Sequence, residues 1–139
     1  MTEKDIEKSI LMFLERIPDS YVCKIDKGGK PVKKGNKTII IPFGGRYSVV
    51  GMSDIMFICQ GKTYFFEVKT PETVKYPRKH FDKLLVTHPD GHSRKVLIQQ
   101  CRFIHSIRKA GAVGEFVASI EDVTTILQLK LYVSDHQDA

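Results

Sequence analysis

The chain has 139 residues, 42% of them hydrophobic, which corresponds to one domain with its own core and excludes a disordered or fibrous protein. Lys and Arg (22) outnumber Asp and Glu (16), and the net charge of +6 favours a polyanionic partner, nucleic acid first. The three cysteines lack CxxC spacing, so we expect no disulfide framework, no cysteine-rich zinc site and a reducing, cytoplasmic location. We expect no membrane span and no secretory signal, because the apolar runs are short and the chain opens with charges.

The first third of the chain predicts one helix followed by short strands. Apolar residues at helical spacing indicate a helix from Glu3 to Ile17, with Thr2 as its N-cap and Asp5 as a capping-box acid. A strand is expected at 21–26 and a short β-branched strand at 38–41. Between them, the Gly-, Pro- and Lys-rich stretch 28–36 indicates a basic loop.

The remainder predicts a hairpin, a basic segment and an alternation of helix and strand. Strands at 54–59 and 62–69 are joined by a tight turn, Gln60-Gly61. The segment 70–92 is polar and basic, an insertion or loop with a short helix at 78–86. A helix at 93–110, a parallel strand at 115–118, a helix at 120–129 and a polar tail at 134–139 follow.

These elements predict a single domain over 1–133 of the α/β class, in which helices flank a mixed β-sheet. The expected order of the main elements is α-β-β-β-α-β-α.

The hairpin places chemistry-bearing residues together. In the register set by Gln60-Gly61, Asp54 lies directly across from Glu67, and Lys69 shares the face of Glu67. Opposed carboxylates repel, so a positive charge is expected between them. Two carboxylates, a strand carbonyl and waters form an oxygen-only shell that suits Mg²⁺, with Mn²⁺ as a substitute. Such a site can support phosphodiester hydrolysis. The structural alternative is an exposed, solvated Glu–Lys pair.

At this level of detail the residues resemble a known family. Asp54 followed by Glu67-Val68-Lys69 is similar to the D…(D/E)xK signature of the PD-(D/E)XK nuclease superfamily, which has a restriction-endonuclease-like fold. The closer resemblance is to its VRR-NUC branch. Further ordered motifs carry it: Glu3-x-x-Ile6, Gly51-x-Ser53-Asp54, a helix with Gln100-x-x-Phe103 closing at Gly111, and Ser119-x-Glu121-Asp122-Val123.

The resemblance implies a set of site roles. Asp54 and Glu67 would bind the metal ion together with the Val68 carbonyl, and Lys69 would act on the attacking water. Gln100 would orient the water or the substrate, with Gln99 as the alternative in register. Glu3 would support the metal site, with Glu7, one turn later, as its alternative.

The resemblance also implies substrate and partners. The expected activity is Mg²⁺-dependent endonucleolytic cleavage of branched DNA such as four-way (Holliday) junctions, by a homodimer and without an organic cofactor. Five basic residues are candidates for DNA contact, although they equally fit solvated surfaces: Arg78, Lys79, Lys83, Lys33 and Lys34. The rival functions are a non-cleaving nucleic-acid-binding module on the same fold and a structural accessory protein.

Overall fold

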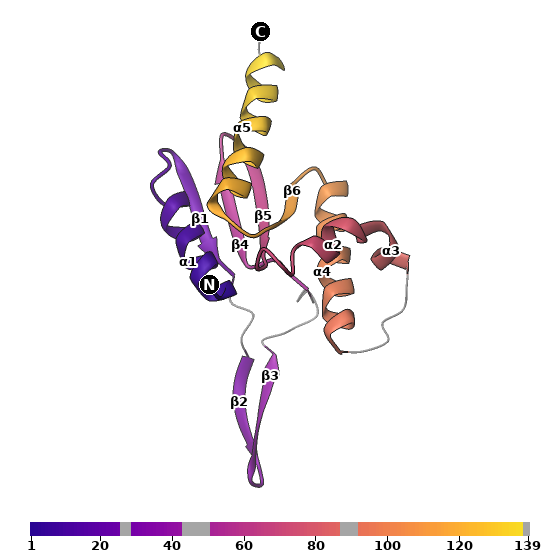
Figure 1. Cartoon of the computed structure of the whole chain (residues 1–139). Helices are drawn as coiled ribbons and strands as arrows, with labels where there is room; N and C mark the ends of the chain where they lie inside the picture. Colours follow the sequence, from indigo (N-terminus) through magenta and orange to yellow (C-terminus); the bar gives the residue numbers. More distant parts are fainter. Residues whose placement is uncertain (26–28, 43–50, 87–91, 138–139) are drawn as a thin grey trace.

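The computed structural model describes residues 1–139 except 26–28, 43–50, 87–91 and 138–139 (Figure 1). Its elements, in chain order, are α1 (Glu3–Leu14), β1 (Ser20–Lys24), β2 (Gly29–Lys34), β3 (Lys37–Pro42), β4 (Ile55–Cys59), β5 (Lys62–Val68), α2 (Lys75–Lys79), α3 (Phe81–Val86), α4 (His92–Lys109), β6 (Val113–Val117) and α5 (Ile120–Gln137).

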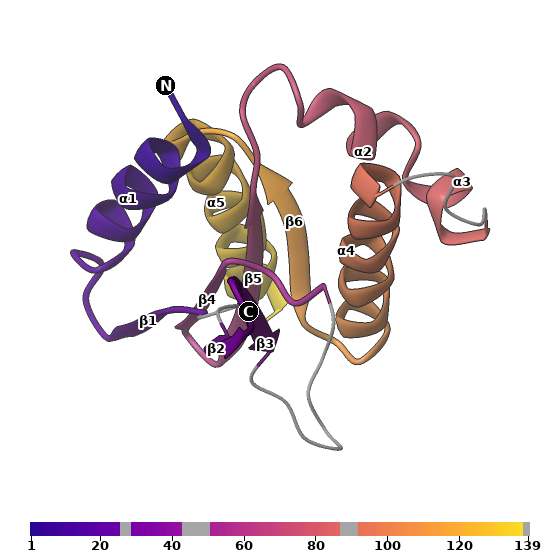
Figure 2. The ribbon, with the colours of Figure 1, turned by 90° about the horizontal axis from the view of Figure 1, so that it is seen from below.

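A four-stranded mixed sheet forms the centre of the domain, in the order β1-β4-β5-β6. The first three strands are antiparallel neighbours, and β6 lies parallel to β5. Helices α1 and α5 cover one face of this sheet and α4 covers the other (Figure 2). The α/β class, the mixed sheet and the parallel last strand are therefore as predicted, and the expected order of elements holds for the main sheet with α1, α4 and α5.

Helix α1 begins as the sequence predicts. The Thr2 hydroxyl accepts a hydrogen bond from the Asp5 backbone N–H at 3.2 Å, and the Asp5 carboxylate accepts one from the Thr2 backbone N–H at 3.1 Å, which completes a capping box. The helix ends at Leu14, three residues before the predicted end at Ile17. We attribute the early end to the tightening of the last turn, where the Ile17 N–H bonds the Leu14 carbonyl.

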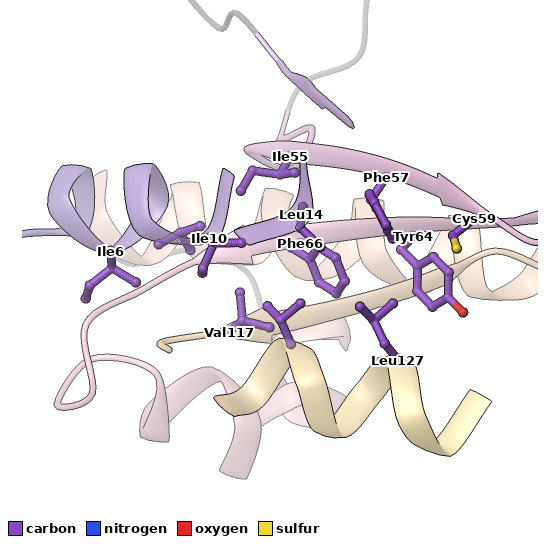
Figure 3. Packing of buried hydrophobic residues seen from close by; sticks show 12 residues of the cluster. Ile6, Ile10, Leu14, Ile55, Phe57, Cys59, Tyr64, Phe66, Val117 and Leu127 are labelled. Carbon is purple, nitrogen blue, oxygen red and sulfur yellow. The ribbon is translucent and has the colours of Figure 1, made fainter. Parts of the chain in front are cut away.

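Two hydrophobic clusters hold the helices on the sheet. The larger one lies between the sheet and the α1/α5 layer, where Ile6, Ile10 and Leu14 of α1 meet Phe66 of β5 and Leu127 of α5 (Figure 3). The smaller one lies under α4 and includes the following buried residues: Val74, Leu84, Ile98, Cys101, Phe103, Ile104, Phe116 and Ala118. Because β5 contributes to both clusters, successive residues of this strand are fixed on opposite faces of the sheet.

The basic stretch predicted as a loop contains a strand. Gly29–Lys34 pairs in antiparallel fashion with Lys37–Pro42, and the two strands form a sheet of their own. The turn between them is Gly35-Asn36, and Gly35 has φ +62°, which suits the first central position of a type II′ turn. The loop prediction is wrong for 29–34, because Gly and Pro are typical of loops but a two-stranded ribbon tolerates both.

Two further boundaries differ from the predictions. The segment after β5 forms two short helices, α2 and α3, in place of one helix over 78–86. Helix α5 continues to Gln137, so residues 134–137 are helical and do not form a tail. Among the residues that the structure describes, no helix combines the length and apolar character needed to cross a membrane.

Candidate active site

The β4–β5 hairpin sets the geometry of the site. Its turn residues Gln60 and Gly61 both have positive φ, +51° and +75°, as a two-residue type I′ turn requires. The resulting register pairs Ile55 with Phe66, and one residue further the Asp54 N–H donates to the Phe66 carbonyl at 3.1 Å. Asp54 lies just before the first residue of β4, and its position directly opposite Glu67 stays a prediction.

Glu67 is a buried carboxylate on the α4 face of the sheet. Its neighbours Phe66 and Val68 belong to the cluster on the opposite face, so the alternation of the strand turns Glu67 toward α4. Only 2% of Glu67 is exposed, and its Oε1 accepts a 2.7 Å hydrogen bond from Nε2 of Gln100, which is itself 7% exposed. A charged group this deeply buried requires partners of this kind, because burial without them is costly.

Asp54 is held by the backbone of the strand beside it. Its Oδ2 accepts a 2.7 Å hydrogen bond from the Val68 N–H, at the end of β5. Its own carbonyl accepts a 2.8 Å bond from the Ile25 N–H, just beyond the end of β1. The carboxylate therefore lies at the end of the two central strands, where β4 begins and β5 ends, and the Val68 N–H fixes its orientation.

Gly51 allows α4 to pack closely against this end of the sheet. It has φ +81°, and a Cβ placed on it would lie 2.5 Å from the backbone carbon and oxygen of Gln99 and 2.9 Å from the backbone nitrogen of Gln100. A glycine is therefore required both for the conformation and for the space. Because Gly51 lies three residues before Asp54, its close contact with the α4 backbone also holds Gln100 near the carboxylates. The sequence showed the glycine, but not its contact with α4.

Lys69 follows directly after β5. Its backbone N–H donates to the Val117 carbonyl at 2.9 Å, which fixes it between the ends of β5 and β6. Burial raises the pKa of the Cys101 thiol in α4 to about 11, while the Lys69 charge acts to lower that pKa and the Glu67 charge to raise it. The prediction that the Glu67 and Lys69 side chains share a face stays a prediction.

The donor set fits a hard divalent cation. Asp54 and Glu67 can supply carboxylate oxygens, and Val68, the residue after Glu67, can supply a carbonyl oxygen. The Gln100 Oε1 atom is buried and has no hydrogen-bond partner within the described part of the chain, so an acceptor remains for a water or a substrate group. The described residues hold no group of three or more His, Cys, Asp and Glu side chains suited to a metal ion. A metal ion at this site would draw on the Asp54 and Glu67 carboxylates, with carbonyl and water oxygens completing its shell.

The predicted acids of α1 occupy different environments. Glu3 is exposed in the first turn of α1, and its role at the site stays a prediction. Its alternative, Glu7, is largely buried and lies 3.3 Å from Nζ of Lys24, an ion pair whose geometry falls short of a hydrogen bond. Lys24 pairs with Ile55, the residue after Asp54. Of the two acids, Glu7 is the one linked to the strands that carry the site.

The structure separates the predicted DNA-contacting residues. Arg78 Nη2 donates to the Phe116 carbonyl at 2.9 Å and to the Asp122 carboxylate at 3.0 Å, so this guanidinium joins α2 to the β6–α5 connection. Lys79 in α2 and Lys83 in α3 are exposed, as are Lys33 and Lys34 on the β2–β3 ribbon, and their contact with DNA stays a prediction.

Comparison of the chain with protein-family models, with curated proteins and with solved structures finds no match. The resemblance to the VRR-NUC branch therefore stays a prediction, and the functional argument depends on the geometry of the site.

Proposed function

We propose that this protein is a Mg²⁺-dependent endonuclease that hydrolyses DNA phosphodiester bonds. The observation that carries the proposal is the placement of two carboxylates at one end of the β4–β5 hairpin. Asp54 accepts a 2.7 Å hydrogen bond from the Val68 N–H, and Glu67, the residue before Val68, is buried and bound to Gln100 at 2.7 Å. A purely structural sheet gains nothing from a buried carboxylate at this position, because the burial of a charge is costly. The net charge of +6 is the sign expected for a DNA-binding enzyme.

Each residue has a role that follows from its position. Asp54, Glu67 and the Val68 carbonyl would hold the metal ion, which when bound lowers the pKa of a water molecule and offsets negative charge on the phosphate. The Val68 N–H and the Gln100 amide fix the orientation of the two carboxylates. The Lys69 ammonium stabilises negative charge that develops on the phosphate or holds the attacking water. The unpaired Gln100 Oε1 accepts a hydrogen bond from that water.

The substrate class and assembly belong to the same proposal. Branched DNA, including four-way junctions, is the expected substrate, and a homodimer would place two sites for paired cuts by two-fold symmetry. Light scattering tests the assembly, because a mass near the 15.8 kDa of one chain contradicts a dimer.

The test of the activity uses purified protein with labelled linear duplex, flap and four-way junction DNA in Mg²⁺, Mn²⁺ or EDTA. We expect metal-dependent cutting that Lys69→Ala and Glu67→Gln abolish. Lys62→Ala is the matched control, because Lys62 lies on the same strand at its other end and should leave cutting unchanged. DNA binding without cutting, in wild type and variants alike, would replace the proposal with the binding-module function. No effect of the site variants on metal or DNA binding would favour a structural role.

A further inference from the structure

The β2–β3 ribbon is a separate projection from the domain. Among the residues that the structure describes, its strands pair only with each other, and it extends from the end of the sheet where β1 finishes and β4 begins (Figure 1). Asp54 lies at this same end, and its carbonyl bonds Ile25, four residues before the ribbon starts. A two-stranded hairpin on its own is only marginally stable in water. The ribbon is therefore expected to gain stability from a bound ligand, and its position near Asp54 would bring that ligand close to the candidate site.

The tip of the ribbon concentrates positive charge. Lys34 pairs directly with Lys37, so their side chains share one face, while Lys33 pairs with Thr38 on the other face. All three lysines are exposed, and none has an ion-pair partner in the part of the chain that the structure describes. Directly opposed like charges destabilise a strand pair. An anion bound beside Lys34 and Lys37 would relieve this repulsion.

The dimensions of the ribbon match duplex DNA. Two strands about 4.8 Å apart with their side chains fit the major groove, which is about 12 Å wide and admits a two-stranded ribbon. The six residues of each strand span about 20 Å, or about six base pairs along the duplex. Lysines on both faces can reach the phosphates on both walls of one groove.

We propose that the β2–β3 ribbon is a DNA-binding arm that lies in a groove of the duplex about six base pairs from the cleaved bond, with Lys33, Lys34 and Lys37 bound to phosphates. This inference rests on the proposed nuclease function for the position of the cut, but binding by the arm does not depend on catalysis.

The experiment measures affinity for a 30-base-pair duplex by fluorescence anisotropy in EDTA, at 50, 100 and 200 mM salt. It compares the full-length wild type with Lys34→Ala/Lys37→Ala. The control, Lys62→Ala/Lys109→Ala, removes the same charge at the opposite end of the sheet. Loss of two phosphate contacts should reduce the slope of log K against log salt by about 1.8. The fold-loss of affinity between 50 and 200 mM salt should therefore be about ten times smaller for the ribbon variant than for the wild type. The control should keep the wild-type slope.

The outcomes separate this inference from the proposed function. An unchanged slope in the ribbon variant, or an equal loss in the control, overturns the DNA-binding arm even when the protein cuts DNA. A reduced slope in a protein that cuts no DNA supports the arm and removes the nuclease function. A dimer that becomes a monomer in the ribbon variant, with its DNA slope unchanged, assigns the ribbon to self-association and also overturns the arm.

Discussion

Substitution of Gly51 by alanine tests whether the candidate site depends on close packing of α4 against the segment that precedes β4. The added Cβ meets backbone atoms of Gln99 at 2.5 Å, and backbone of a helix cannot move aside as a flexible side chain can. The positive φ of +81° adds a conformational penalty of about 1–2 kcal/mol. Overpacking adds about 1–3 kcal/mol, so the free energy of unfolding should fall by about 2–5 kcal/mol.

Gly61→Ala is the matched control for this prediction. Gly61 has a similar φ of +75°, but nothing lies within 4 Å of its added Cβ, so only the conformational penalty of about 1–2 kcal/mol applies. For 139 residues, 1 kcal/mol corresponds to about 3 °C in the melting temperature. Thermal and urea unfolding followed by circular dichroism should therefore show a drop of about 6–15 °C for Gly51→Ala and about 3–6 °C for Gly61→Ala. Equal losses in the two variants would refute the packing argument.

Three further predictions concern Arg78, the cysteines and the N-terminal cap. Arg78→Ala should lower the free energy of unfolding by about 1 kcal/mol in urea, because it removes hydrogen bonds to Asp122 and to a β6 carbonyl at partly exposed positions. The salt slope of DNA binding should not change, and a slope reduced by about one would show a phosphate contact instead. At pH 8 a thiol reagent should modify the partly exposed Cys23 quickly and Cys101 only after unfolding, because Cys101 is buried and burial raises its pKa to about 11. Fast modification of Cys101 in the native protein would contradict its burial. The pKa of Asp5 lies below its usual 3.8 because the backbone and hydroxyl of the N-cap threonine bond its carboxylate. The stabilisation that the ionised Asp5 carboxylate gives to α1 is therefore present at pH 7 and lost as the pH falls through the lowered pKa. The difference in melting temperature between wild type and Asp5→Asn should accordingly narrow toward pH 2.5. A difference that stays constant with pH would contradict this prediction.

The hairpin that carries the site was predictable because its information is local. A two-residue turn fixes the register of both strands, and this register brings Asp54, just before β4, beside the end of β5, where its carboxylate bonds the Val68 N–H. The capping box of α1 was predictable for the same reason, since Thr2 and Asp5 are three residues apart.

Contacts between distant segments were not predictable in this way. The choice between Gln99 and Gln100 depends on how α4 rotates over the sheet, and the structure brings Gln100 to Glu67 while the Gln99 backbone lies against Gly51. Arg78 was grouped with exposed basic residues because its partner, Asp122, lies 44 residues away. The second strand of the ribbon, β3, was predicted at 38–41, whereas the first, β2, was not, because its glycine and proline are typical of loops as well as of edge strands.

The attachment of α2 and α3 determines how the chain can be shortened. Val74 and Leu84 are buried in the cluster under α4, and Arg78 joins α2 to the carbonyl of Phe116. Helices α2 and α3, within the segment that resembles an insertion in the sequence, are therefore packed against the folded core, and a shortened chain that omits them would expose part of the cluster under α4. The β2–β3 ribbon has the opposite character, since its strands pair only with each other. Affinity tags, labels or loop replacements intended to spare the fold belong at Gly35-Asn36 rather than between β5 and α4.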